Sequence, residues 1–123
     1  TRALIKARSA GDKDYTTEFL DLILAVKIVN TLDEALGFIA QTSTRHSEGI
    51  IAQNSNAIAR FVNEIDAAAL FVNCSTRLHD GGVFEMGAEM GIATGKLHAR
   101  GPVGLYELTT YKWVAYGSGQ IRE

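Results

Sequence analysis

The sequence contains very little cysteine and proline and has no excess of positive charge. Cys74 is the only cysteine among 123 residues, which excludes an internal disulfide and a zinc site built from cysteines alone. The single proline argues against linkers between domains. Because 14 acidic residues outnumber 12 lysines and arginines, for a formal net charge of −2, the sequence predicts no nucleic-acid partner.

The sequence also lacks a long apolar run. No stretch approaches the roughly 20 apolar residues that span a bilayer, and the N-terminus lacks the pattern of a secretory signal. We therefore expect a cytoplasmic protein with no membrane partner. With 46% hydrophobic and 21% charged residues, the composition is typical of one globular domain. The chain begins at Thr1 without an initiator methionine, so we also expect it to be part of a longer polypeptide.

The first part of the chain predicts a strand followed by a helix. Residues 1–17 are polar and predict a loop with one helical turn, whereas Phe19–Val29 is an aliphatic run typical of a strand buried on both faces. Thr31 and Glu34 have the spacing of a capping box, which starts a helix. The apolar face of this helix would consist of Leu32, Ala35, Leu36 and Ile39.

The middle of the chain continues this alternation. Residues 49–52 predict a second strand, Asn54 or Ser55 caps a second helix, and residues 67–72 predict a third strand. The βαβαβ order with short connections predicts an α/β fold, one half of a doubly wound parallel sheet, in which ligands bind beyond the carboxyl ends of the strands. The apolar face of the second helix would consist of Ile58, Phe61, Val62 and Ile65.

Residues 73–104 follow the third predicted strand and hold more than half of the 12 glycines. Such a density of glycine is typical of a loop where the backbone comes close to a ligand. The nearby hydroxyl groups and cations suit a phosphate or a carboxylate, because arginine offers a forked donor and lysine a point charge. The alternative is a solvated loop. The candidate anion-binding residues are Thr76, Arg77, Thr94, Lys96 and Arg100.

Other side chains have competing interpretations. Cys74 follows a strand and is either a nucleophile in the electropositive setting of Arg77 or inert packing. His46 is either a solvated or capping histidine or a residue that touches the site. A metal site is disfavoured, because no two of its candidate ligands have helical spacing with a third nearby. Those candidates are His79, Glu85, Glu89 and His98.

The end of the chain predicts an element with a different role. Residues 105–108 predict the end of a short helix. Thr109–Tyr116 then predicts a strand rich in β-branched and aromatic residues. This strand either pairs between subunits in an oligomer or forms an ordinary edge of the same sheet.

Several motifs along the chain point to one family. They are Ala35-Leu-Gly-Phe-Ile39 with Thr42-Ser-Thr-Arg-His-Ser-Glu-Gly-Ile50, Val72-Asn-Cys-Ser-Thr-Arg77, Gly87-Ala-Glu-Met-Gly-Ile92, Lys96-Leu-His-Ala-Arg-Gly-Pro-Val-Gly-Leu105, Glu107-Leu-Thr-Thr-Tyr-Lys112 and Gly117-Ser-Gly-Gln-Ile-Arg122. Together they resemble the C-terminal region of the γ-glutamyl phosphate reductase (glutamate-5-semialdehyde dehydrogenase) family, in the aldehyde dehydrogenase superfamily. The chain departs from the family pattern at Val83–Met86.

The resemblance implies reduction of L-glutamate 5-phosphate to L-glutamate 5-semialdehyde with NADPH, in proline biosynthesis. The nucleophilic cysteine of the family would precede Thr1, so no catalytic residue is expected in this chain, which alone would be inactive. Cys74 falls where the family tolerates alanine or cysteine. Residues 1–108 would form the C-terminal part of an aldehyde-dehydrogenase-like catalytic domain, and residues 109–123 an oligomerisation strand and tail of a homo-oligomer.

The resemblance also implies roles for individual residues. Glu18 would hold the ribose hydroxyls of the nicotinamide nucleotide. The substrate, glutamyl phosphate, would be bound by Asn73, Ser75, Arg77, Thr94, Lys96, His98 and Arg100. The alternative to an enzyme is a non-catalytic module that binds an anion or assists assembly.

Overall fold

The computed structural model describes residues 6–122 of the chain. Residues 1–5 of the predicted loop and Glu123 of the predicted tail lie outside the described residues. No helix in the described part is long and apolar enough to cross a membrane. The elements in chain order are η1 (Asp12–Thr16), α1 (Leu32–Thr42), β1 (Ser47–Ile50), α2 (Ser55–Glu64), β2 (Ala69–Val72), η2 (Thr76–Leu78), β3 (Gly91–Ala93) and β4 (Gly101–Val103), where η marks a 3₁₀ helix.

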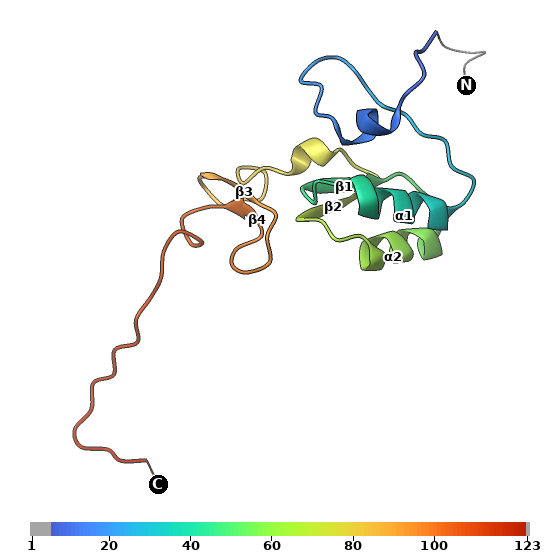
Figure 1. The fold of residues 1–123 in the computed structure, drawn as a ribbon. Coiled ribbons are helices and arrows are strands. Elements are labelled where there is room, and N and C mark those ends of the chain that lie inside the picture. Colours follow the sequence, from blue (N-terminus) through green and yellow to red (C-terminus); the bar gives the residue numbers. More distant parts are fainter. Residues whose placement is uncertain (1–5, 123) are drawn as a thin grey trace.

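The centre of the fold is a βαβ unit made of β1, α2 and β2. The two strands are parallel neighbours, with Ser47 opposite Ala69. Figure 1 shows α1 and α2 together on one side of this strand pair. β1 begins and ends two residues before the predicted range 49–52, and β2 begins two residues after the start of the range 67–72. The predicted parallel α/β arrangement is confirmed for this unit.

A small apolar core lies between the two helices and one face of the strand pair. Phe61 of α2 is 2% exposed, and Leu36 of α1 and Ile65 are also buried. Val62 is 45% exposed, so its predicted place on the buried face is wrong. Successive helical residues point about 100° apart, and a buried Phe61 therefore turns Val62 to the edge of the contact. The partly buried residues packed against this core are Leu32, Ile39, Ile50, Ala67 and Leu70.

The start of α1 follows the predicted capping box with one difference. The Thr31 hydroxyl accepts a hydrogen bond from the backbone N–H of Glu34 at 3.1 Å. The Glu34 carboxylate reaches back to the N–H of Asn30 at 3.0 Å, one residue before the cap. Both bonds satisfy backbone donors near the first turn, where α1 has no internal acceptors for them.

The predicted first strand, residues 19–29, is wrong. The segment is irregular, and Leu20, Leu22 and Leu24 are 93%, 104% and 85% exposed. Leu20 has a φ of 52°, which lies outside the range of a strand. A strand also needs a neighbour for its N–H and C=O groups, and β1 pairs only with β2 within residues 6–122. The predicted βαβαβ order is therefore reduced to βαβ.

The C-terminal part contains an antiparallel pair of strands and an extended arm. Ile92 of β3 lies opposite Pro102 of β4. Residues 105–108 form a turn instead of the predicted helix end. Thr109–Tyr116 forms no strand, because nothing in the described part pairs with it, and Trp113 is 91% exposed. Figure 1 shows this segment leading away from the rest of the molecule, and its pairing between subunits stays a prediction.

The structure predicts that Asn54, and not Ser55, stabilises the start of α2. The Asn54 side-chain oxygen accepts from the N–H of Ala57 at 3.0 Å. Asn54→Ala should lower the free energy of unfolding by about 1 kcal/mol, whereas Ser55→Ala should change it by less than about 0.5 kcal/mol. Urea titration followed by circular dichroism measures both values. Equal losses in the two variants would contradict the assignment of the cap.

Candidate functional site

The face of the strand pair that is turned away from the helices is partly covered by the loop after β2. Side chains alternate along a strand, so Ser47, Gly49 and Phe71 point to this face. Thr76 lies over Gly49, because a Cβ added to Gly49 would meet the Thr76 methyl carbon at 3.4 Å. The ring of His79 lies 6.0 Å from the ring of Phe71. The loop therefore brings polar side chains onto this face.

A chain of hydrogen bonds joins two histidines through one hydroxyl. Nδ1 of His79 lies 2.7 Å from Oγ of Ser47, which in turn lies 2.7 Å from Nδ1 of His46. His79 is 7% exposed, and its Nε2 is buried without a hydrogen-bond partner. Burial lowers the pKa of His79, the neighbouring His46 lowers it further, and Glu89 opposes both. We call residues 46, 47 and 79 the His-Ser-His cluster.

An open cavity of about 380 Å³ adjoins the His-Ser-His cluster. It brings together Glu18, predicted to hold the cofactor, and Thr94, predicted to bind the substrate. His46 lines the same cavity and so lies near these two predicted site residues. One carboxylate, an imidazole and several hydroxyl groups offer both donors and acceptors of hydrogen bonds. The lining residues are Glu18, Thr44, His46, Ser47 and Thr94.

Sequence reasoning missed Asp66, which lies just before β2 and binds two of the predicted site cations. Its carboxylate is 2.8 Å from Nζ of Lys96 and 2.7 Å from Nη1 of Arg100, and Arg45 lies at 3.8 Å. Hydrogen bonds from Lys96 and then Arg100 lower the pKa of Asp66 to about 2. No motif marks this aspartate in the sequence. The ion pairs hold the segment that connects β3 and β4 against the amino end of β2.

Two other predicted site residues support the backbone near the carboxyl end of β2. The Asn73 side chain accepts from the N–H of Ala52 at 2.8 Å and donates to its C=O at 2.9 Å. Ser75 accepts from the N–H of Arg77 at 3.2 Å and caps η2. The guanidinium of Arg77 is exposed and makes no hydrogen bond or ion pair within residues 6–122. Arg77 therefore differs from Lys96 and Arg100 in that its whole guanidinium is unpaired in the described part of the chain.

The predicted substrate residues thus do not form one group, and Thr94 lies apart from the others in the open cavity. Residues 73–77 lie after the carboxyl end of β2, whereas residues 96–100 lie toward its amino end, where Asp66 holds the two cations. Nε2 of His98 lies 3.1 Å from the carbonyl oxygen of Glu107. Cys74 is a free, exposed thiol. Within the described part, no three histidine, cysteine or acidic side chains are grouped to hold a metal ion.

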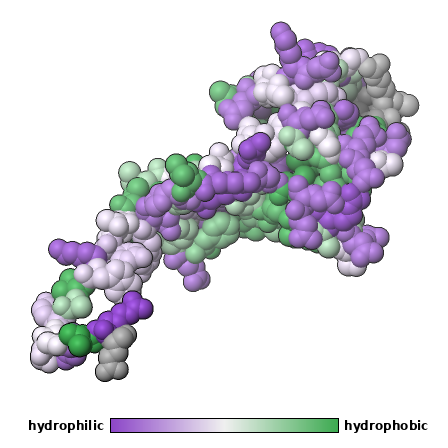
Figure 2. Space-filling view, turned by 60° about the horizontal axis from the view of Figure 1, so that its bottom comes forward, coloured by the Kyte–Doolittle hydropathy of each residue, from purple (hydrophilic) through white to green (hydrophobic). Residues whose placement is uncertain are grey.

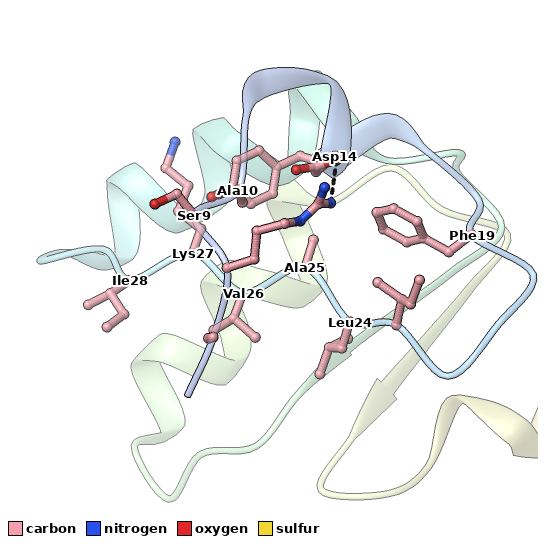
Figure 3. A pocket seen from close by; sticks show the side chains of 13 residues that line it. Ser9, Ala10, Asp14, Phe19, Leu24, Ala25, Val26, Lys27 and Ile28 are labelled. Atoms are coloured by element: carbon pink, nitrogen blue, oxygen red, sulfur yellow. Dashed lines mark hydrogen bonds and ion pairs between the residues drawn. The ribbon is translucent and has the colours of Figure 1, made fainter. Parts of the chain in front are cut away.

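A larger cavity, of about 580 Å³, lies between the N-terminal segment and residues 23–28. Figure 3 shows Phe19 and Leu24 beside it, together with the contact of 3.5 Å between Arg8 and Asp14. Most of the residues that line this cavity are apolar, so it is better suited to contact with another apolar surface than to binding a charged ligand. Figure 2 shows further hydrophobic atoms open to solvent on the body of the molecule and along the C-terminal arm.

Comparison with curated proteins finds close relatives over nearly the whole chain. The chain is 55% identical over 119 residues to gamma-glutamyl phosphate reductase of Streptococcus suis (strain 05ZYH33) and 59% identical over 113 residues to that of Clostridium tetani (strain Massachusetts / E88). These matches cover 97% and 92% of this chain, but 29% and 26% of the relatives. The chain therefore spans less than a third of the length of these relatives. No family model matches it.

Comparison with solved structures gives the same relationship. The crystal structure of gamma-glutamyl phosphate reductase from Thermotoga maritima matches with a TM-score of 0.84 and 55% sequence identity. The match covers 93% of this chain and 28% of that chain. At this identity the likeness extends to the sequence as well as to the fold.

The structure predicts that Asp66 makes the docking of β3 and β4 depend on pH. The folded pKa of about 2 lies below the ordinary 3.8, so the ion pairs stabilise the fold fully above about pH 4 and lose this effect as the pH falls through about 2. Hydrogen-exchange protection of the β3 and β4 amides should therefore fall over this range. Asp66→Asn should lower the protection already at neutral pH and abolish its dependence on pH.

Asp33→Asn provides the matched control for the Asp66 variant. The Asp33 carboxylate pairs with Arg60 at 2.7 Å between α1 and α2, away from β3 and β4. Its loss should leave the protection of β3 and β4 as in the parent chain. Unchanged protection in Asp66→Asn would show that the ion pairs do not dock this part.

Proposed function

The chain belongs with the gamma-glutamyl phosphate reductases that it matches, and from this relationship we propose that it takes part in reducing L-glutamate 5-phosphate to L-glutamate 5-semialdehyde and phosphate. The observation that carries the proposal is 55% identity over 119 residues. The reaction belongs to proline biosynthesis. Because the chain spans 29% of the length of its Streptococcus suis relative, the activity is proposed for a polypeptide of the relatives' length that contains these residues.

A nicotinamide nucleotide, NADPH, is the reductant in this proposal and supplies the hydride when bound. The cavity beside the His-Ser-His cluster fits part of such a cofactor, because the Glu18 carboxylate can accept hydrogen bonds from ribose hydroxyls. The hydroxyl of Thr94 adds a further partner there. In this proposal the nucleophilic cysteine belongs to the part of the relatives that this chain does not cover, so residues 1–123 alone should be inactive.

In the proposed site, Arg77 binds the phosphate group of the substrate. Its guanidinium has no partner among the described residues, and a charge-assisted, forked contact to an oxyanion is strong and directional. Asn73 and Ser75 shape the loop that carries it, through their bonds to the backbone. Lys96 and Arg100 contribute by docking, since each pairs with Asp66, although Nε and Nη2 of Arg100 keep no hydrogen-bond partner among the described residues.

The alternative is a non-catalytic module that binds an anion or assists assembly. Assembly is favoured by one observation, the exposed aromatic side chains of Thr109–Tyr116. Enzyme and assembly element are compatible, because the arm can pair between subunits of a homo-oligomer while other residues bind the substrate. Titration of the 123-residue chain with phosphate distinguishes the anion-binding module from the enzyme. A module of this kind would bind phosphate tightly without any further residues.

Arg77→Ala in a reductase of the relatives' length should weaken substrate binding selectively. In the reverse reaction, with the semialdehyde, phosphate and NADP⁺, the KM for phosphate should rise about 10- to 100-fold, because a charge-assisted bond is lost. The KM for NADP⁺ should stay within about twofold. Steady-state kinetics measures both constants.

Two further variants make the Arg77 test specific. Arg77→Lys keeps the charge but loses the fork, so the KM for phosphate should lie between those of the parent and of Arg77→Ala. Arg122→Ala removes an exposed cation of the tail and should leave both constants unchanged. Equal rises for phosphate and NADP⁺ in Arg77→Ala would contradict the proposed role.

Trp113→Lys in the same reductase tests the assembly role of the arm. Trp113 is 91% exposed and lies edge-on to Tyr111, with ring centroids 5.8 Å apart. A charge placed in an apolar contact between subunits is costly, so the variant should sediment as a smaller species. Analytical ultracentrifugation compares it with the parent. An unchanged mass would count against pairing through this segment.

A further inference from the structure

The Ser47 hydroxyl couples the protonation states of two histidines. A hydroxyl has one hydrogen, and both of its ring-nitrogen partners, on His46 and His79, lie at 2.7 Å. If Ser47 donates to one ring, the other ring must donate to Ser47. A choice at one histidine therefore decides which nitrogen carries the hydrogen at the other.

The buried side of His79 selects between the two arrangements. Nε2 of His79 has no hydrogen-bond partner in its buried position, and the neutral ring carries hydrogen on one nitrogen only. An orphaned buried N–H is rarer than an orphaned acceptor. The favoured arrangement therefore places the hydrogen on Nδ1 of His79, which donates to Ser47, and leaves Nε2 as the unprotonated nitrogen.

The consequence reaches the open cavity through Ser47. When His79 donates to Ser47, the hydroxyl hydrogen of Ser47 is available for Nδ1 of His46. An unprotonated Nδ1 places the hydrogen of neutral His46 on Nε2, which has no partner within residues 6–122. If both rings donated instead, the Ser47 hydrogen would have no acceptor among the described residues.

We propose that His46 is a ligand-binding residue of the cavity, where it presents Nε2–H as a hydrogen-bond donor, and that Ser47 and His79 are positioning residues that fix this arrangement. The inference deepens the proposed function and rests on it for the identity of the ligand. Glu18 in the same cavity is an acceptor, and Lys96 and Arg100 are held by Asp66. The donor and acceptor together suit an uncharged hydroxyl or carboxamide group of the nicotinamide nucleotide better than a phosphate.

Nitrogen-15 NMR of the 123-residue chain tests the tautomers without any ligand. The chain has three histidines, and His98 is an internal reference, because its Nε2 bonds to a carbonyl oxygen at 3.1 Å and must carry the hydrogen. At neutral pH, His79 should show hydrogen on Nδ1, and His46 should show it on Nε2. Hydrogen on Nε2 of His79, or a charged His79, would overturn the proposal.

Two substitutions at Ser47 separate positioning from a general effect on the fold. Ser47→Ala removes the shared hydroxyl, so the signals of His46 and His79 should move toward mixed tautomers, while the His98 signal, which reports its own contact with Glu107, stays in place. Ser47→Thr keeps a hydroxyl and should restore the parent pattern. Unchanged His46 and His79 signals in Ser47→Ala would contradict the coupling.

A kinetic measurement on the reductase of the relatives' length tests the link to the cavity. Ser47→Ala should raise the KM for NADPH about tenfold and change kcat much less, since one hydrogen bond to bound cofactor is weakened. Ser47→Thr should behave like the parent. An active parent with an unchanged KM in Ser47→Ala would refute the placement of His46. A parent without reductase activity would refute the proposed function and leave the NMR result to decide the tautomers.

Discussion

A sheet of two strands has two faces to cover, and the described fold follows from how each face is covered. On one face, α1 and α2 bury Phe61 and Leu36 against the strands. On the other face, the loop after β2 places Thr76 over Gly49. The same loop ends by burying His79, whose polar ring requires a partner and finds it in Ser47 of β1. Ser47, which lines an open cavity, is therefore the residue that satisfies the buried ring of His79.

The elements that could be predicted are those whose cause is local. The caps and apolar faces of α1 and α2 depend on residues three or four positions apart, and Thr31 and Asn54 cap them as the sequence indicates. Residues 19–29 and Thr109–Tyr116 have the composition of strands, yet neither forms one. A strand forms only when a neighbouring strand pairs with it, and the sequence of one segment does not identify that partner. Composition alone therefore could not predict whether these two segments form strands.

The site shows the same limit for charged groups. Residue type leads to the expectation that Lys96 and Arg100 bind the substrate, whereas in the structure both pair with Asp66, a single aspartate in a short connection that carries no motif. The family resemblance implies different ligands for Glu18 and Thr94, whereas the structure brings the two residues to one cavity. Spacing along the chain cannot give such juxtapositions, because they depend on how the loop of residues 73–104 returns across the sheet.

The large exposed surface of the chain indicates which residues of the open cavity are fixed in position by packing and which are not. Its 10435 Å² of accessible surface exceeds the about 6,400 Å² expected of a compact chain of this size. Much apolar surface is exposed along residues 19–29, and Glu18 directly precedes this segment. The position of Glu18 therefore depends on what packs against residues 19–29. In a polypeptide of the relatives' length, further residues can cover this segment. His46 is tied instead to the βαβ unit through Ser47 and His79, so the imidazole side of the cavity is formed by this chain's own packing.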